Sequence, residues 1–372
     1  MNSADENNGT VQSSKEIGTG SDKDKETPGS DHGQRYSRQE RFAPFGREGQ
    51  KRLLASHVLV VGAGALGSAV SETLVRAGVG RVTIADRDYV EWSNLQRQQL
   101  FTEQDAEERL PKAIAAQRRL SRINSGVEVI GRVTDVRAQE LSELSQGVHV
   151  IMDATDNFET RLIINDIAYK HGIPWIYGGC VGSSGMSFTF LPQETPCLNC
   201  LLGTIPMGGD TCDVHGILPQ AVQMVAAHQT MEAMKLLAGQ RHVLRKKMLS
   251  FDVWRNERVE FGVERARRTD CPTCGEHPVY PYLSAANVEK SEVLCGRDTV
   301  QIRPARPKRL ALRQLAEQLN SLREGSATAT PYMVMYRVNG HRLVIFEDGR
   351  TLIHGTSDIA AARTLYNKYV GG

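Results

Sequence analysis

The sequence has 372 residues, of which 40% are hydrophobic and 24% charged, as is typical of a globular chain long enough for two or three domains. A formal net charge of only +2 excludes a protein that binds nucleic acid or anionic lipid through a large positive surface, so we expect neither partner. No run approaches the ~20 apolar residues of a membrane span. Seven cysteines without a signal segment favour reduced thiols and a cytoplasmic location over a disulfide framework.

Composition divides the chain into three parts. Residues 1–33 contain almost no large apolar side chains, so they cannot bury enough surface to offset the entropy of ordering and are predicted to be a disordered tail. Residues 34–285 are predicted to form the main domain. Residues 286–372 are predicted to form a small α+β module.

Apolar runs alternate with amphipathic stretches through the main domain. Strands are predicted at 58–61, 82–85, 127–133, 148–152 and 175–177, with helices ending near 77 and spanning 112–123 and 158–170. This alternation predicts an α/β fold with a Rossmann-like, doubly wound, mostly parallel sheet. Strands near 187–191 and within 248–264, on either side of a helix at 218–237, are predicted to be antiparallel additions to that sheet.

The C-terminal module has shorter elements. Its strands are predicted near 299–302, 332–338 and 342–346, and its helices near 312–322 and 359–369. The Ser-Ala-Thr stretch at 326–330 is predicted to be a loop.

A glycine-rich turn follows the first predicted strand. Gly62, Gly64 and Gly67 have the spacing Gly-x-Gly-x-x-Gly between a strand and a helix, where backbone N–H groups and the positive end of the helix favour a phosphate. Asp86 ends the second strand, where a carboxylate can bind ribose hydroxyls. The pattern predicts nucleotide binding but does not separate NAD, FAD and ATP.

Two cysteine pairs lie far downstream of this turn. Cys197, Cys200, Cys271 and Cys274 form two C-x-x-C pairs, and four thiolates are enough to close a tetrahedral zinc site with no open position. A closed site of this kind stabilises structure and does not activate water. A redox-active C-x-x-C is the alternative, which the presence of two pairs disfavours.

Several polar motifs lie in a fixed order between the turn and the cysteines. They are Arg35-Tyr36-Ser37-Arg38-Gln39, Asp86-Arg87-Asp88, Ser93-Asn94-Leu95-Gln96-Arg97-Gln98, Pro111-Lys112 and Asp153-Ala154-Thr155-Asp156-Asn157. Together with the glycine turn and the cysteine pairs, they resemble the sulfur-carrier adenylyltransferases of the ThiF, MoeB and HesA type, which are bacterial relatives of the ubiquitin-activating enzymes. The resemblance spans residues 35 to about 274 and is strongest to the ThiF type.

The resemblance implies a site for ATP and Mg²⁺. Asp86 would hold the ribose, Asn94, Arg97 and Lys112 would contact the triphosphate, and Asp156 would bind Mg²⁺. Attack of a carboxylate on the α-phosphate needs this kind of chemistry, because positive groups and a hard cation must neutralise the phosphate oxygens. Surface ion pairs are the alternative explanation of these charges.

The resemblance also implies partners. Arg38 would reach into the ATP site of a neighbouring subunit, which predicts a homodimer. The other partner would be a small β-grasp sulfur carrier that ends in Gly-Gly. Cys212 would be able to form a covalent link to this carrier, a role that not all members of the family need.

The implied reaction is ATP-dependent adenylylation of the carrier's C-terminal glycine, which gives an acyl-adenylate and pyrophosphate. A ThiS-type carrier for thiamine thiazole synthesis is favoured, with a MoaD-type carrier for molybdopterin, or dehydration of tRNA threonylcarbamoyl-adenosine, as alternatives. An NAD-dependent oxidoreductase would not need Arg97, Lys112 and Asp156, and a non-catalytic binding module would not keep them intact. The chain itself ends in Gly371-Gly372, which predicts a helix stop, with a fused carrier tail as the alternative.

Overall fold

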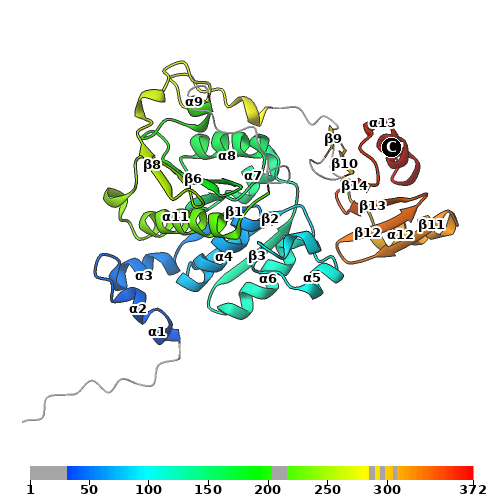
Figure 1. Ribbon diagram of the computed structural model, residues 1–372, viewed down its shortest axis with the longest axis horizontal. Helices are drawn as coiled ribbons and strands as arrows, with labels where there is room; N and C mark the ends of the chain where they lie inside the picture. The colour runs from blue at the N-terminus through cyan, green and yellow to red at the C-terminus, as the bar shows by residue number, and fades with distance from the viewer. Residues whose placement is uncertain (1–31, 203–215, 285–289, 294–297, 305–307, 372) are drawn as a thin grey trace, which may run out of the picture.

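The computed structural model describes residues 32–202, 216–284, 290–293, 298–304 and 308–371. These residues form two β-sheets, a larger one in the first 261 residues and a smaller one near the C-terminus (Figure 1). The predicted tail lies outside the described residues except for His32 and Gly33, which belong to helix α1. Cys212 and Gly372 also lie outside them.

The larger sheet has eight strands in the order β3-β2-β1-β4-β5-β6-β7-β8. Neighbours from β3 to β5 are parallel and those from β5 to β8 are antiparallel, so the predicted parallel sheet with antiparallel additions is confirmed. The strands are β1 (His57–Val61), β2 (Arg81–Asp86), β3 (Glu128–Val133), β4 (Val150–Asp153), β5 (Trp175–Val181), β6 (Ser184–Phe190), β7 (Met248–Asp252) and β8 (Glu257–Phe261).

Helices cover both faces of this sheet (Figure 1). The helices of this part of the chain are α1 (His32–Arg35), α2 (Ser37–Glu40), α3 (Gly46–Leu54), α4 (Ala65–Ala77), α5 (Glu103–Glu107), α6 (Lys112–Ile123), α7 (Ala138–Leu144), α8 (Phe158–His171), α9 (Leu198–Leu202) and α11 (Pro219–Leu237), of which α1 and α2 lie at the edge of the molecule (Figure 1). Short 3₁₀ helices span Trp92–Asn94 (η1), Arg241–Val243 (η2), Glu264–Ala266 (η3) and Pro281–Leu283 (η4). None of the helices in the described part of the chain is long and apolar enough to cross a membrane.

Strand β1 shows why its apolar run is buried on both sides. Val58 and Val60 belong to the core that includes residues of α4 and α11, whereas Leu59 and Val61 belong to the core that includes residues of α8. Successive side chains of a strand point to opposite faces, so a continuous run of β-branched and aliphatic residues fits a sheet covered on both faces.

The smaller sheet has six antiparallel strands in the order β11-β12-β13-β14-β10-β9. Its elements are β9 (Lys290–Val293), β10 (Thr299–Arg303), α12 (Leu312–Ser321), β11 (Gly325–Ala329), β12 (Met333–Val338), β13 (His341–Phe346), β14 (Thr351–His354) and α13 (Ile359–Tyr369). The loop predicted at 326–330 is wrong, because residues 325–329 pair with β12 as an edge strand of small side chains. Such residues lack the bulky β-branched pattern that indicates a strand.

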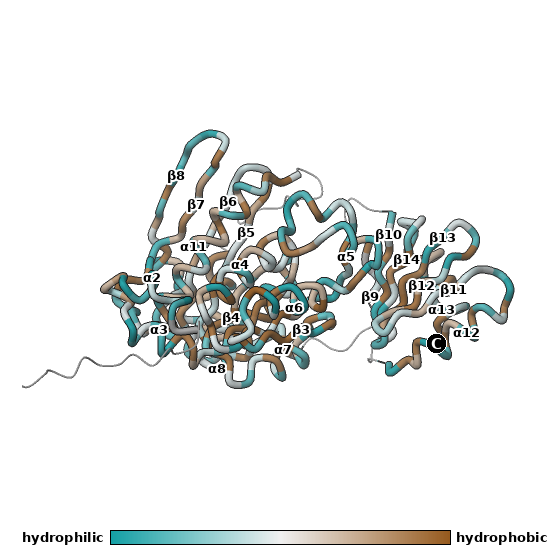
Figure 2. The backbone as a smooth tube through the Cα atoms, turned by 90° about the horizontal axis from the view of Figure 1, so that it is seen from below, coloured by the Kyte–Doolittle hydropathy of each residue, from teal (hydrophilic) through white to brown (hydrophobic). Residues whose placement is uncertain are grey.

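Both faces of the smaller sheet are covered. One face packs against α12 and α13, which contribute Leu319 and Tyr366 to a common core. Residues of the other face pack against Tyr89, which follows β2 of the larger sheet. Both views place the smaller sheet beside α5, at one end of the molecule (Figures 1 and 2).

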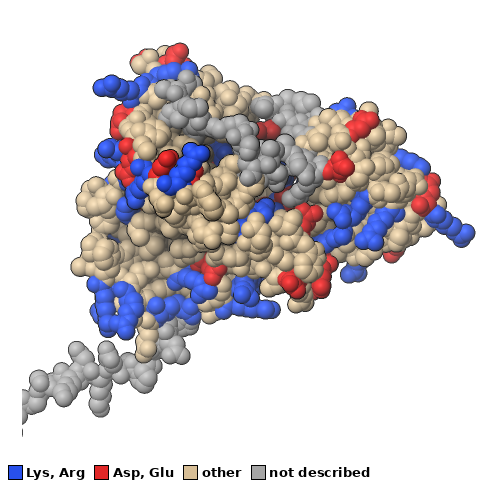
Figure 3. Space-filling view, in the orientation of Figure 1, with Lys and Arg blue, Asp and Glu red and all other residues tan. Residues whose placement is uncertain are grey.

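The surface has an extended hairpin and a mixed distribution of charge. The β7–β8 hairpin extends away from the larger sheet (Figure 2), and Trp254 at its turn is 78% exposed. On the face seen in Figure 3, groups of Lys and Arg are interspersed with groups of Asp and Glu over both sheets. This mixture agrees with the near-neutral net charge of +2.

Candidate functional site

The glycine turn joins β1 to α4 and leaves open space at one of its three glycines. Gly62 has φ +99°, and a Cβ there would lie 2.5 Å from the carbonyl oxygen of Ala154. A Cβ on Gly67 would lie 1.9 Å from the carbonyl oxygen of Gly62. At Gly64, by contrast, the nearest atom to an added Cβ is Nε2 of Gln98, at 3.9 Å. The first glycine therefore lets the turn pack against the residue that follows β4, and the third lets α4 pack against the turn itself, while the second leaves room beside the backbone.

This room lies at the start of α4. Gly64 is the N-cap of the helix, and no side chain caps it. The first N–H groups of a helix have no partner within the helix and carry partial positive charge, so an uncapped end suits an anion. A phosphate group beside Gly64 would satisfy them.

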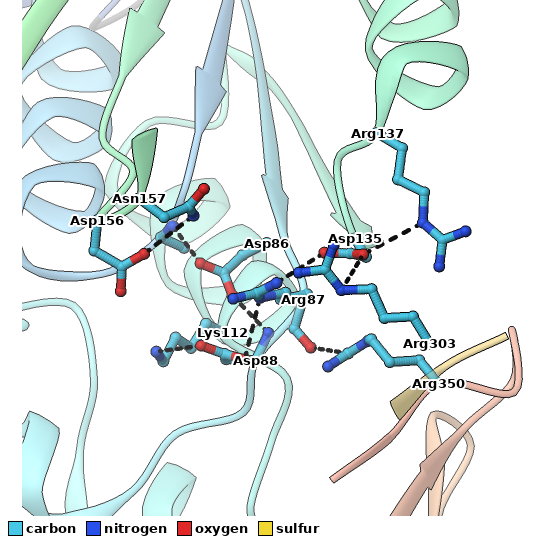
Figure 4. A network of polar contacts seen from close by, with 11 residues as sticks. Asp86, Arg87, Asp88, Lys112, Asp135, Arg137, Asp156, Asn157, Arg303 and Arg350 are labelled. Carbon is cyan, nitrogen blue, oxygen red and sulfur yellow. Dashed lines mark hydrogen bonds and ion pairs between the residues drawn. The ribbon is translucent and has the colours of Figure 1, made fainter. Parts of the chain in front are cut away.

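Asp86 fixes the end of β2 against this turn. Its Oδ2 accepts a hydrogen bond from the Ala63 N–H at 2.6 Å, and its Oδ1 accepts one from the Asp88 N–H at 2.6 Å. Burial raises the pKa of Asp86 above its usual range, and the nearby Asp88 adds to this, although Lys112 opposes it. The carboxylate predicted to hold the ribose is thus tied directly to the glycine turn (Figure 4).

Lys112, the first residue of α6, is held against the same segment. Its backbone N–H donates to the carbonyl of Asp88 at 2.9 Å, and its Nζ lies 3.5 Å from Oδ2 of Asp88. The side chain is only 8% exposed. The structure therefore brings together Asp86 and Lys112, although 26 residues separate them in the sequence.

Two buried amides lie between β2 and α5. Asn94, in η1, is 1% exposed and accepts a hydrogen bond from the Glu91 N–H, but its Nδ2 has no partner among the residues that the structure describes. The same is true of Oε1 of Gln98, which is 4% exposed. Burying an unpaired polar group costs about 1–3 kcal/mol, so such atoms point to a ligand. Asn94 was predicted to contact phosphate, whereas Gln98 stands in the same motif but had no predicted role.

Arg97 lies on the same turn as these amides. It is half-buried, and its Nη1 donates to the carbonyl of Ser93 at 2.9 Å. This bond fixes the guanidinium near the 3₁₀ turn that carries Asn94.

Asp156 is exposed on the loop that follows β4. Its Oδ1 accepts a hydrogen bond from Nδ2 of Asn157 at 3.4 Å, and Oδ1 of Asn157 in turn caps α8 by accepting from the Thr160 N–H at 2.9 Å. An exposed carboxylate on a capped loop is free to bind a hard cation such as Mg²⁺.

A buried arginine on α8 holds the loop that carries Asp156. Arg161 lies 2.9 Å from Oδ2 of Asp153 and donates to the carbonyl of Thr155 at 2.7 Å. Burial alone would lower the pKa of Arg161, but the Asp153 carboxylate outweighs it and raises the pKa. Sequence reasoning missed Arg161, because its spacing from Asp153 carries no motif.

Arg38 does not join this group. It is exposed on α2, and the neighbouring Tyr36 packs on Gly78, where an added Cβ would lie 2.5 Å from the ring. Gly78 ends α4, a helix of 13 residues that spans about 20 Å from Gly64. Arg38 therefore lies at the opposite end of α4 from the glycine turn of its own chain.

The four predicted zinc ligands do meet. The Sγ atoms of Cys197, Cys200, Cys271 and Cys274 all lie within 4.8 Å of one another, and two pairs are 3.5 Å apart. These distances are too long for disulfides, whose sulfur atoms are ~2.05 Å apart. Four sulfurs ~2.3 Å from one zinc ion would be about 3.8 Å from each other, so the cluster fits tetrahedral zinc.

Helix α8 connects the cysteine cluster to the loop that carries Asp156. Oδ1 of Asn165 accepts from the Leu198 N–H at 2.8 Å, beside the first cysteine pair. The carboxylate of Asp166 accepts from Oγ1 of Thr273 at 2.6 Å, within the second pair, and from the Tyr282 N–H at 2.9 Å. The same helix begins next to Asp156. The cluster therefore anchors the helix on which the Asp156 loop depends.

The model of the ThiF family matches residues 36–273 of this chain. The chain belongs to the ThiF family. A sulfur carrier protein ThiS adenylyltransferase from Bacillus subtilis is 53% identical over 339 residues, which cover 91% of this chain and 99% of that protein. A sulfur carrier protein adenylyltransferase from Thermus thermophilus is 37% identical over 255 residues, covering 66% of this chain and 91% of that protein.

Solved structures agree with this assignment at the level of the fold. The crystal structure of E. coli MccB with ATP superposes with a TM-score of 0.56 and 21% identity, over 65% of this chain and 74% of that one. The Bacillus alignment leaves less than a tenth of this chain uncovered, so it extends into the smaller sheet. This member of the ThiF family therefore shares at least part of its C-terminal region with that relative.

Proposed function

We propose that this ThiF-family protein is an adenylyltransferase that uses ATP to activate the C-terminal glycine of a small, ThiS-type sulfur carrier. The observation that carries the proposal is the meeting of the uncapped start of α4, Asp86 and Lys112 at one edge of the sheet. These groups suit the phosphates and ribose of a nucleotide. The name of the Bacillus relative, which is 53% identical, supports the choice of carrier.

In the proposed reaction, a carboxylate oxygen of the carrier attacks the α-phosphorus of ATP. The bond from this phosphorus to the bridging oxygen breaks, and pyrophosphate leaves with the electron pair. Lys112 and Arg97 neutralise charge on the phosphates, and Asn94 donates its free Nδ2 hydrogens to them. Asp156 would hold Mg²⁺, which neutralises further phosphate charge.

We further propose that the active unit is a homodimer in which Arg38 completes the site of the partner subunit. The support is its position at the end of α4 remote from its own glycine turn. Zinc would be structural, held by the four thiolates. We place the enzyme in the cytoplasm, because free thiols persist in a reducing compartment.

Cys212 is proposed to act after adenylylation. Its thiolate would attack the carrier acyl-adenylate, forming a thioester and releasing AMP. A Cys212→Ser variant that keeps pyrophosphate exchange but no longer forms a covalent carrier adduct would support this role. An adduct that still forms in the variant would contradict it.

The chain's own C-terminal tail is a poor candidate for the substrate, although its last residue, Gly372, which would carry the reacting carboxylate, lies outside the described residues. The preceding residue, Gly371, follows α13, and its carbonyl accepts a hydrogen bond from Nζ of Lys308 at 2.6 Å. Lys308 also lies over the ring of Tyr366, 5.9 Å from its centroid. A substrate tail has to be extended and free, so these contacts favour a separate carrier protein.

The test is ATP–pyrophosphate exchange with Mg²⁺, measured for the protein alone, with a ThiS-type carrier and with a MoaD-type carrier. Exchange that needs the ThiS-type carrier and disappears when its last glycine is deleted is the expected result. Exchange only with the MoaD-type carrier would move the protein to molybdopterin synthesis. Absence of exchange with both carriers would contradict the proposed adenylyltransferase activity on these carriers and favour a tRNA substrate.

A further inference from the structure

The smaller sheet contacts the segment that follows β2, beside the proposed nucleotide site. Nη2 of Arg350, which immediately precedes β14, donates a hydrogen bond to the backbone carbonyl of Arg87. Nε of Arg303, the last residue of β10, lies 3.1 Å from Oδ2 of Asp135. Figure 4 shows both arginine side chains reaching from the smaller sheet toward the ends of β2 and β3.

Asp135 connects three arginines from two parts of the chain. Its carboxylate lies 3.0 Å from Nη1 of Arg87, 3.4 Å from Nε of Arg137 and 3.1 Å from Nε of Arg303. Its side chain is only 7% exposed. Burial alone would raise the pKa of Asp135, but Arg87 and Arg303 outweigh it and hold the pKa below its ordinary value. The ends of β2 and β3 are thus tied to the smaller sheet through one ionised carboxylate.

Side chains of the segment after β2 alternate between two environments. Asp86 and Asp88 contact the glycine turn and Lys112, as described above. Arg87 bonds to Asp135, and Tyr89 is 4% exposed among apolar residues of the smaller sheet. Alternation of this kind is expected of an extended backbone. Nε of Arg87 also lies 4.0 Å from Oδ1 of Asp88, so Arg87 links the two environments, and the smaller sheet holds the segment through Arg87 and Tyr89.

Burying the charged side chain of Arg350 to make this contact costs free energy of folding. It is 1% exposed, and its Nε and Nη1 have no hydrogen-bond partner among the described residues. Its guanidinium lies 3.7 Å from the centroid of the Phe346 ring. Burial lowers the pKa of this guanidinium and outweighs Asp348, Asp135 and Asp88, which favour its charge. Burying a charged group without a direct ion pair is costly, and an apolar side chain of similar volume often gives a more stable protein. Stability alone does not account for an arginine here.

We propose that the smaller sheet is a working part of the nucleotide site, and that Arg350 and Arg303 are positioning residues for it. Through the Arg87 carbonyl and Asp135, they hold the segment from Asp86 to Tyr89 so that Asp86 and Lys112 face ATP. This inference rests on the proposed function, because it takes ATP as the ligand beside Asp86. Since binding energies couple reciprocally, bound ATP also tightens the docking of the smaller sheet.

The first test compares the full-length wild type with Arg350→Met and with the control Arg313→Ala, an exposed arginine on α12. Binding of Mg²⁺–ATP without carrier is measured by calorimetry, and unfolding is followed thermally. Arg350→Met is expected to keep or raise the melting temperature while weakening ATP binding about tenfold, the effect of one lost charge-assisted hydrogen bond. Arg313→Ala should match the wild type in both.

ATP binding by Arg350→Met that equals the wild type would overturn the inference. If the wild type bound no ATP, this result would instead contradict the proposed function, and the inference that rests on it would fail as well. In pyrophosphate exchange, the variant should show a raised KM for ATP and an unchanged KM for the carrier. A general loss of folding would instead lower the maximal rate and leave both KM values unchanged.

A second measurement needs no substitution. Hydrogen exchange of the wild type is followed with and without Mg²⁺–ATP. Amides in residues 341–354, which contain β13 and β14, are expected to exchange more slowly when ATP is bound. Those of α12, on the other face of the smaller sheet, should not change. Equal exchange in 341–354 under conditions where ATP binds would contradict the proposed coupling.

Discussion

The backbone carbonyl of Arg87 accepts a hydrogen bond from Arg350, 263 residues later in the sequence. Arg87 lies between Asp86, which is bonded to the glycine turn, and Asp88, which is bonded to Lys112. This short segment thus links the proposed nucleotide site to the smaller sheet.

Asp86→Asn is expected to raise the KM for ATP in pyrophosphate exchange by about ten- to a hundredfold. The amide keeps the size of the side chain, but it presents only one oxygen to the Ala63 and Asp88 N–H groups and the ribose, and it loses the charge-assisted bonds. Glu317→Gln, an exposed carboxylate on α12, is the matched control and should behave as the wild type. An unchanged KM would place the ribose elsewhere.

Subunit mixing tests the role of Arg38. At an ATP concentration far below the raised KM of Asp86→Asn, Arg38→Ala and Asp86→Asn should each show little activity as homodimers. If Arg38 acts in the partner's site, random mixing of the two gives dimers with one intact site, and about a quarter of wild-type activity should return. Activity that stays absent after verified subunit exchange would place Arg38 in the site of its own chain.

Loss of the proposed zinc ion should destabilise the cysteine cluster and, through α8, the loop that carries Asp156. Cys274→Ser is expected to lower the zinc content of the purified protein and to lower the melting temperature by about 5 °C or more, because a structural zinc site supplies several kcal/mol. Cys180→Ser, a cysteine outside the cluster, serves as the control. Normal zinc content in Cys274→Ser would rule out the four-cysteine site.

Asp135 predicts a dependence of stability on pH. Its pKa lies below the ordinary 3.8 in the folded protein, so its stabilising effect is present above pH 3.8 and is lost as the pH falls through the folded value. Asp135→Asn should reduce the free energy of unfolding by about 3 kcal/mol, since it removes the buried carboxylate that pairs with three partly buried arginines. The difference from the wild type should be constant between pH 8 and about pH 5 and shrink below pH 3.8. A difference that grows on acidification would contradict this assignment.

Most of the fold and part of the candidate site could be predicted from local sequence patterns. The glycine turn, Asp86 and the start of α6 at Lys112 are predictable because each depends on a few neighbouring residues in a strand–turn–helix unit. The cysteine cluster was predictable for a different reason, since four thiolates with this spacing have few other uses.

The remaining contacts join residues whose sequence positions carry no common signal. Arg161 and Gln98 owe their roles to the packing of α8 and of the segment after η1, which no spacing rule encodes. The link between Arg350 and Arg87 depends on how two sheets dock. Strand β11 was missed because its small side chains gain their strand character from pairing with β12, and not from their own propensity.

The bond from Arg350 to Arg87 also has a consequence for synthesis. At about 5–20 residues per second, the ribosome makes Arg350 roughly 4–18 seconds after Phe261, the last residue of the larger sheet, so that sheet has time to fold first. During that interval Tyr89 lacks the apolar neighbours that later cover it. The nascent chain therefore passes through a stage in which an apolar surface is exposed and the segment from Asp86 to Tyr89 lacks its contacts with the smaller sheet.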